Sequence, residues 1–238
     1  MVANAGIDGH SSLGHIRSFE LWFPNIPGLA PDYALIYVGH NDRGVASGEV
    51  PQPDSMTSPS WSRRFGVYIR NHSVFSRAIK NLSGWIAASQ IDVTYGEFDT
   101  SEDNVRFVPV ELPALDMERL APLLAAYGER LEVLNTMVLQ FGTIPVFITQ
   151  PVGLLREGAT GPEEVEGSRA GLIERELNLY NQVLLEFCTE KDALCIDLAS
   201  EVSFDTADFY DAIHTTPSGS RRIGEYLAAK WPQVVAAP

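Results

Sequence analysis

The stretch YALIYVGHND, residues 33–42, decides the fold predicted for this chain. It begins with an unbroken apolar run, YALIYV, which is typical of a strand buried on both faces of a parallel sheet. A glycine and three polar residues follow at once. Ligands bind beyond the carboxyl ends of the strands in open α/β sheets, so residues 39–42 mark a place where function is expected.

Two further apolar runs have the same character, PVFITQ (145–150) and ALCIDL (193–198). A long segment with helical periodicity precedes each of them, and its apolar stripe is expected to face the core. The stripes consist of Leu120, Leu123, Leu124, Tyr127, Leu131, Leu134, Val138 and Phe141 in the first segment, and of Leu172, Ile173, Leu177, Tyr180, Val183, Leu184 and Phe187 in the second. Gly142 is predicted to end the first helix, and a third helix is predicted from Pro217 with Thr216 as its cap. This alternation predicts an α/β fold with a parallel sheet.

Residues 45–112 interrupt the alternation. Their first part is rich in proline and serine and predicts a loop, residues 65–79 have helical spacing, and residues 91–110 predict extended segments around an acidic turn. An insertion of this length forms a lid or substrate wall, or else it decorates the surface. We therefore predict a single domain, residues 1–238, with an insertion at about 45–112.

Composition excludes some classes of partner. The chain has 238 residues, 45% of them hydrophobic, which is enough for one sizeable core. Lys and Arg total 17 against 31 Asp and Glu, and the resulting charge of −14 would repel a nucleic acid backbone. No apolar run approaches the ~20 residues that span a bilayer. We expect a soluble chain without a cofactor, and its compartment stays open because an upstream targeting segment would not be visible here.

The cysteines, Cys188 and Cys195, lie in the stretch FCTEKDALC, one at the predicted end of a helix and the other in a strand. We expect two buried free thiols rather than a disulfide.

Three short stretches stand at predicted strand ends: NAGIDG (4–9), VGHND (38–42) and DAIHTTPSG (211–219). Acyl transfer needs a base held by a carboxylate, and donors directed at the oxygen that becomes negative. Asp211 and His214 can supply the first, and the Gly9 backbone and the Asn41 amide can supply the second. Taken one at a time, these stretches also fit an ordinary turn, an Asx cap and a surface ion pair.

Together the three stretches resemble the SGNH (GDSL-type) hydrolases, whose conserved blocks carry a Ser, a Gly, an Asn and a His. The resemblance implies a three-layer α/β/α sandwich of the flavodoxin-like kind. It implies that Gly9 and Asn41 donate to the oxyanion, that His214 is the general base and that Asp211 orients it. His40 and Asp42 are then expected to line the substrate pocket.

The departure from the family lies at the start of the chain. The family's first block carries the nucleophilic serine at the end of a central strand, and it lies upstream of the block that NAGIDG resembles. Almost nothing precedes NAGIDG here, so we expect that strand and its serine to be missing from this sequence. In the family this strand lies between the strands that here end near Ala3 and Val38. Its absence would therefore leave two unpaired strand edges.

Internal residues do not replace the nucleophile. Ser11 and Ser12 stand where a helix should start and are expected to cap it. Ser218 and Ser220 follow His214 in a first helical turn and are expected to point away from it. His10, His15 and His40 lie near the same strand ends, but they lack the spacing of metal ligands, so no metal site is predicted.

The leading hypothesis is an ester hydrolase that acts on acetyl or other short acyl esters of a small molecule or glycan. The first alternative is a non-catalytic protein that keeps the pocket and binds an acylated glycan or a protein. The second is a polysaccharide O-acyltransferase, in which an alcohol replaces water as the acceptor. A homo-oligomer and an extracytoplasmic location remain open under each hypothesis.

Overall fold

The computed structural model describes residues 2–7, 9–45, 105–112 and 114–236. The chain divides into one unit of residues 1–51 and 98–238 and another of residues 52–97. The second unit lies outside the described residues, and so do the loop and the helix predicted for the first part of the insertion.

The three apolar runs form one parallel sheet in the order β1-β3-β6. Their pairing runs from Tyr33 opposite Ile144 to Tyr37 opposite Ile148, and from Val146 opposite Leu194 to Ile148 opposite Ile196. The strands are β1 (Tyr33–Tyr37), β3 (Ile144–Ile148) and β6 (Leu194–Ile196). This confirms the predicted α/β class, although β6 is shorter than the run ALCIDL because a short helix begins at Leu198.

The long helices follow their apolar stripes. Asp116 caps the first of them by accepting from the backbone of Arg119, and Gly142 follows its end with a φ of +84°. Thr216 caps the last helix, as predicted, by accepting from Gly219. The helices are α1 (Ser12–Leu21), α4 (Met117–Gln140), α5 (Ala170–Lys191), α6 (Leu198–Glu201) and α7 (Pro217–Val235), with 3-10 turns η1 (Phe23–Asn25), η2 (His40–Gly44) and η4 (Thr206–Asp208).

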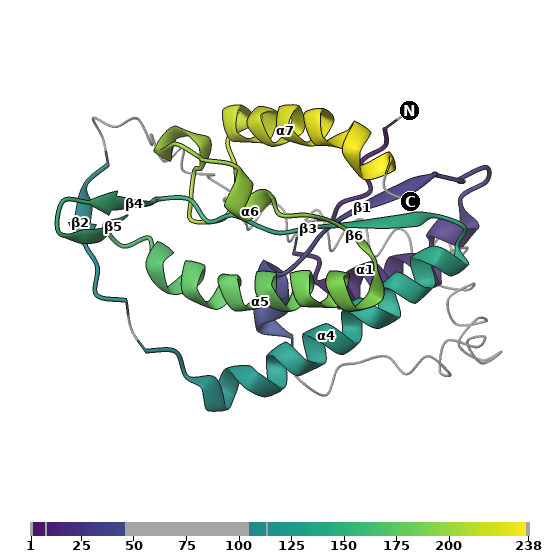
Figure 1. Ribbon diagram of the computed structural model, residues 1–238, viewed down its shortest axis with the longest axis horizontal. Coiled ribbons are helices and arrows are strands. Elements are labelled where there is room, and N and C mark those ends of the chain that lie inside the picture. Colours follow the sequence, from purple (N-terminus) through teal and green to yellow (C-terminus); the bar gives the residue numbers. More distant parts are fainter. Residues whose placement is uncertain (1, 8, 46–104, 113, 237–238) are drawn as a thin grey trace, which may run out of the picture. The chain divides into compact units, whose positions relative to one another are not determined.

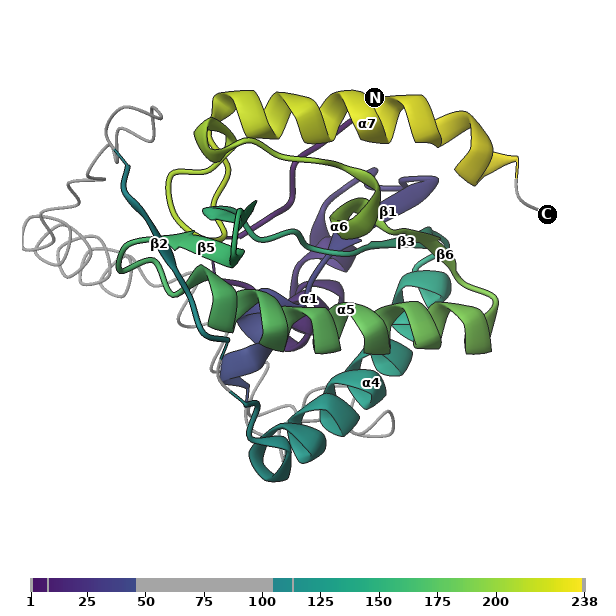
Figure 2. The same cartoon turned by 60° about the vertical axis from the view of Figure 1, so that its left-hand side comes forward.

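Helices cover both faces of the parallel sheet (Figures 1 and 2). On one face, α7 packs Ile223, Leu227 and Trp231 against a cluster that contains Val146 and Ile148. On the other face lie α4 and α5, where the ring of Phe187 meets that of Phe147 edge to face. Val146, Phe147 and Ile148 of β3 are therefore buried from both sides, which explains why their sequence does not alternate.

A second, antiparallel sheet has the order β2-β5-β4. It joins the end of the insertion to a hairpin that follows β3, through pairs such as Phe107 opposite Val165. The strands are β2 (Phe107–Pro109), β4 (Leu155–Gly158) and β5 (Gly161–Val165). The extended segment predicted at the end of the insertion is thus confirmed for β2, whereas the hairpin was not anticipated, because its sequence LREGATGPEEV lacks an apolar alternation.

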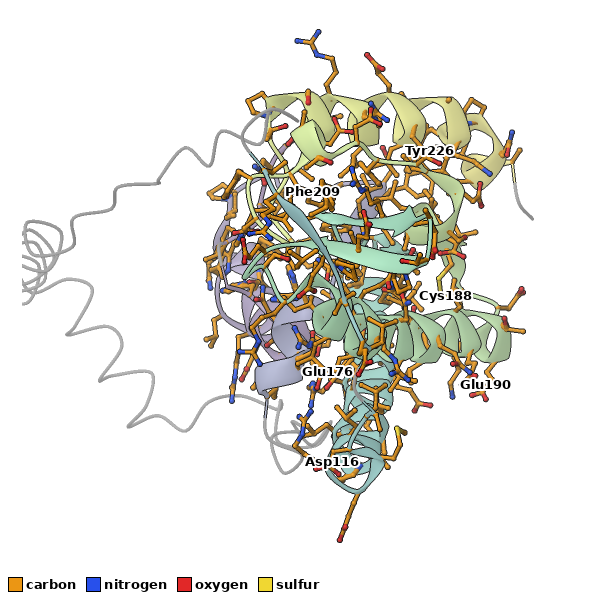
Figure 3. All side chains as sticks on the ribbon, turned by 90° about the vertical axis from the view of Figure 1, so that its left-hand side faces the viewer. Asp116, Glu176, Cys188, Glu190, Phe209 and Tyr226 are labelled. Atoms are coloured by element: carbon orange, nitrogen blue, oxygen red, sulfur yellow. A yellow bond between two sulfur atoms is a disulfide. The ribbon has the colours of Figure 1, made fainter. Side chains whose placement is uncertain are left out.

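The cysteines are bonded to each other, and the expectation of two free thiols was wrong. The Cys188–Cys195 disulfide joins the last turns of α5 to β6 across a Cα separation of 6.2 Å (Figure 3, where Cys188 is labelled). The helix must end and the chain reverse within the intervening residues, and this turn brings the two Cα atoms into the range that a disulfide bridges.

None of the helices in the described part of the chain combines the length and the apolar character needed to cross a membrane.

Candidate active site

Asp211 and His214 lie in the loop between η4 and α7. The His214 Nδ1 atom is 2.7 Å from Asp211 Oδ2. The other carboxylate oxygen of Asp211 accepts from the backbone N–H groups of Ile213 and His214, each at 2.8 Å. The structure therefore brings the predicted base and its predicted orienting carboxylate together in one loop.

This loop is closed by its own backbone. Tyr210 N donates to the His214 carbonyl at 3.1 Å, and Thr216 N donates to the Asp208 carbonyl at 2.8 Å. The ring of Tyr210 stacks on the imidazole of His214 with centroids 5.4 Å apart. The stacked ring of Tyr210 and the carboxylate of Asp211 together fix the orientation of the imidazole.

The electrostatics of the pair favour an ionised carboxylate. Partial burial raises the pKa of Asp211, but the hydrogen bonds from His214 and Ile213 outweigh it, and the pKa lies below its usual value. An ionised Asp211 accepts the Nδ1 proton of a neutral imidazole, which leaves the lone pair on Nε2. Nε2 is the atom that a base would use.

Asn41 and Gly9 also lie together, on two loops that face each other. Asn41 is in η2, directly beyond β1, and its Nδ2 atom donates to the His10 carbonyl at 3.1 Å. Gly9 adopts a φ of +74°, which favours glycine, in the turn closed by His10 N and the Ile7 carbonyl. The two predicted oxyanion donors therefore belong to neighbouring backbone segments.

The segment after β3 ties both loops to the carboxyl end of the sheet. Gln150 Oε1 accepts from His40 N at 2.6 Å, and Gly153 N donates to the Ala212 carbonyl at 2.9 Å. A Cβ at Gly153 would lie 2.1 Å from the ring of Phe209, so only glycine allows this approach (Phe209 is labelled in Figure 3). Residues 150–153 hold the Asn41 loop and the His214 loop at the same rim.

Gln150 is a site residue that the sequence did not single out. Asn181 of α5 fixes its backbone, accepting from Gln150 N at 3.0 Å and donating to its carbonyl at 2.9 Å. Gly39, which is buried with a φ of +141°, leaves room for it, since a Cβ there would lie 3.3 Å from Gln150 Oε1. The sequence feature that could have indicated Gln150 is its place as the polar residue at the end of the apolar run PVFIT.

His40 is half-buried at the start of η2, beside Asn41, and its role in lining a pocket stays a prediction. The pKa of His40 is lowered to about 4, mainly by burial and also by the charge of Arg43 and by His214, while Asp211 opposes them. His40 therefore lies within electrostatic reach of both members of the Asp211–His214 pair and is neutral near pH 7.

Asp42 does not line a pocket, which corrects the expectation. Its side chain is fully buried, because Arg130 of α4 and Ser12 of α1 surround its carboxylate. The physical reason is that the buried guanidinium of Arg130 requires an anionic partner, and Asp42 supplies it.

The serines near the site make hydrogen bonds to their surroundings. Ser11 caps α1, as predicted, with its hydroxyl accepting from Gly14 N. Ser12 is not the cap and is fully buried against Asp42. Ser218 donates to Asp208 Oδ1 at 2.9 Å, and Ser220 is paired with the Thr215 hydroxyl.

The histidines beside the Gly9 turn face each other, with the rings of His10 and His15 edge to face and their centroids 5.5 Å apart. Within the described residues, no three His, Cys, Asp or Glu side chains are grouped so that they could hold a metal ion.

No protein-family model, curated protein or solved structure matches this chain significantly. The roles of the site residues are therefore inferred from their geometry and chemistry.

Proposed function

We propose that this chain supplies the general base, the orienting carboxylate and the oxyanion donors of a serine ester hydrolase of the SGNH (GDSL) type, with the flavodoxin-like sandwich of that family. The substrate class is an acetyl or other short acyl ester of a small molecule or glycan. His214 is the base, Asp211 orients it, and Gly9 and Asn41 stabilise the negative oxygen of the tetrahedral intermediate.

The observation that carries this proposal is the 2.7 Å contact between His214 Nδ1 and Asp211 Oδ2 at the rim that also bears Asn41. A carboxylate on Nδ1 fixes the tautomer in which Nε2 can take a proton from a hydroxyl and return it to the leaving alcohol. Amide donors near that point would stabilise charge as it develops, which is the largest single contribution in many acyl-transfer enzymes.

The nucleophile belongs outside the residues that the structure describes. The Ser11 hydroxyl accepts from Gly14 N as the cap of α1, and the Ser12 hydroxyl donates to Asp42 in the interior, so we assign the nucleophile to neither. A serine from another segment would attack the acyl carbon while His214 takes its proton. Breakdown of the tetrahedral intermediate would release the alcohol, which takes the proton from His214, and leave the acyl group on the serine. Water would then attack this acyl group and release the acid.

Hydrolysis of p-nitrophenyl acetate by the full-length protein tests the proposal. We expect Asp211→Asn to lower kcat by about 10⁴-fold, because the imidazole then adopts the wrong tautomer. Asp32→Asn is the matched control, since Asp32 is exposed at the start of β1 and should leave kcat unchanged. Equal activity of Asp211→Asn and the wild type would refute the assignment.

A fluorophosphonate probe followed by mass spectrometry locates the nucleophile. A stoichiometric adduct on a serine outside the described residues is expected, and an adduct on Ser11 or Ser12 would contradict the roles given to them.

A binding protein is the second candidate, and the occupied hydroxyls of Ser11 and Ser12 favour it. A protein of this kind would show calorimetric binding of an acylated glycan, no probe adduct and no hydrolysis.

A further inference from the structure

A fully buried charged cluster lies directly behind the Asn41 loop. The side chains of Ser12, Asp42 and Arg130 are all 0% exposed. Arg130 donates from Nη2 to Asp42 Oδ1 at 3.1 Å and from Nε to Ser12 Oγ at 2.8 Å. Ser12 in turn donates to the same carboxylate, from its hydroxyl to Oδ1 and from its backbone N–H to Oδ2 at 2.9 Å.

The cluster joins the two segments that carry the proposed oxyanion donors. Asp42 follows Asn41 directly, and Ser12 lies two residues beyond His10, whose carbonyl accepts from Asn41. The Gly9–Ser12 segment and η2 are thus cross-linked twice, once through the Asn41 amide and once through the Asp42 carboxylate. Arg130, on the separate helix α4, anchors the second link.

The far side of η2 is anchored in a similar way. Arg43 donates from Nε to Glu176 Oε2 of α5 at 2.9 Å, and Arg119 of α4 pairs with the other oxygen of the same carboxylate (Glu176 is labelled in Figure 3). Together with the bonds from His40 N to Gln150 and from Asn41 to His10, each residue from 40 to 43 has a hydrogen-bond partner outside η2. The loop is restrained on every side.

A contribution to stability does not by itself explain why the cluster of Ser12, Asp42 and Arg130 is buried. Burial raises the pKa of Asp42, and the hydrogen bonds from Ser12 and Arg130 offset only part of that rise. Arg130 Nη1 is also buried with no hydrogen-bond partner among the described residues. Well-packed apolar residues are often as stabilising as a buried ion pair, whereas a polar network fixes one geometry.

We propose that Arg130 is a positioning residue for the oxyanion donors and acts through Asp42 and Ser12. It touches no substrate. Its role is to hold η2 against the start of α1 so that the Asn41 amide and the Gly9 N–H converge on one point. This inference rests on the proposed function.

Two variants of the full-length protein test it. Arg130→Lys keeps the buried charge but cannot bond to Ser12 and Asp42 in the same fork, and Ser12→Ala removes only the hydroxyl. For both, we expect kcat to fall by about 10- to 100-fold with KM little changed, because a small displacement of a preorganised donor weakens transition-state binding. The pH dependence of kcat should keep its shape, since His214 and Asp211 are untouched.

Glu132→Gln is the matched control. Glu132 lies on the same helix but pairs with Lys191 at the surface, so its loss should leave kcat unchanged. Should Arg130→Lys fail to fold, the smaller Ser12→Ala change decides the question. Unchanged kcat in the folded variants of an active enzyme would overturn the positioning role.

A second readout separates this inference from the proposed function. Hydrogen exchange of the Asn41 side-chain amide, followed by NMR, should be faster in Arg130→Lys and in Ser12→Ala than in the wild type. Faster exchange in a protein without esterase activity would refute the hydrolase and leave the coupling intact. Unchanged exchange would refute the coupling whatever the activity.

Discussion

At the scale of single residues, the loop before α7 brings Asp211 and His214, three residues apart, into a side-chain hydrogen bond. Asp211 uses one oxygen to accept from the loop's own backbone and presents the other to His214 at 2.7 Å. The backbone bonds place the carboxylate, and the carboxylate places the imidazole. Such local geometry can be anticipated from sequence because all its members lie within one turn of chain.

Asn41→Ala tests the oxyanion role. In an active full-length protein, kcat should fall by about 10²-fold or more, since one oxyanion donor contributes roughly 2.7 to 4 kcal/mol. Substrate binding should change little, and Asn178→Ala, at an exposed position of α5, should behave as the wild type. A higher KM with unchanged kcat would show that Asn41 contacts only the ground state.

The lowered pKa values of His15 and His40 predict that the protein loses stability in mild acid. Burial lowers the pKa of His15 to about 4, with His10 adding to the effect, and the pKa of His40 also lies at about 4. Unfolded histidine titrates near 6.5, so between these values the unfolded chain binds more protons than the folded one. The free energy of unfolding should therefore fall as the pH drops from about 6.5 to about 4.

Urea titrations at pH values of about 7, 5.5 and 4.5 measure this effect. The double variant His15→Asn, His40→Asn should show a flatter dependence over the same range. A wild-type free energy of unfolding that stays constant across it would contradict the burial of both imidazoles as neutral rings.

At the scale of elements, the first turn of α7 fixes the position of the His214 loop. A Cβ at Gly219 would lie 2.1 Å from the Asp208 carbonyl oxygen, which also accepts from Thr216 N. The helix start and the loop before it are therefore in backbone contact, and neither can move alone.

Gly219→Ala should lower both stability and esterase activity, because the helix start must shift away from Asp208. Gly224→Ala, on the same helix with nothing within 4 Å of its added Cβ, should instead stabilise the protein by roughly 0.5–1 kcal/mol. Thermal unfolding and kcat of the two variants provide the comparison. Similar behaviour of both would show that the close approach at Gly219 is not a constraint.

The disulfide between α5 and β6 predicts a second effect at this scale. Free-thiol titration of the denatured, unreduced chain should find no free cysteine. Replacing Cys188 and Cys195 by alanine should cost about 2.5 kcal/mol, as expected from loop closure over their sequence separation of 7. Two titratable thiols would contradict the bond.

At the scale of the whole molecule, the parallel sheet has an edge at β1. Among the described residues β1 pairs only with β3, and its Leu35 and Tyr37 side chains are 47% and 39% exposed. An edge strand with apolar side chains is a template for pairing with another chain.

Self-association measured by sedimentation should therefore rise with protein concentration. Leu35→Lys should reduce it, because a charge on an edge strand opposes pairing. Leu139→Lys, at a similarly exposed leucine of α4, is the control that should not. Equal association of both variants and the wild type would exclude this edge as the contact.

The features that depend on neighbouring residues were predictable from the sequence. Apolar runs became the paired strands β1 and β3, although β1 is partly exposed where burial on both faces was expected. Thr216 and Ser11 became helix caps, and Asp211 met His214 within one loop. No sequence pattern indicated that Arg130, 118 residues from Ser12 and 88 from Asp42, would bury a charge behind Asn41. The Cys188–Cys195 bond and the hydrogen bond from His40 N to Gln150 also depend on how separate elements pack. The physical reason is that caps and periodicity are encoded in adjacent residues, whereas the partner of a buried polar group is chosen by the packing of elements far apart in the chain.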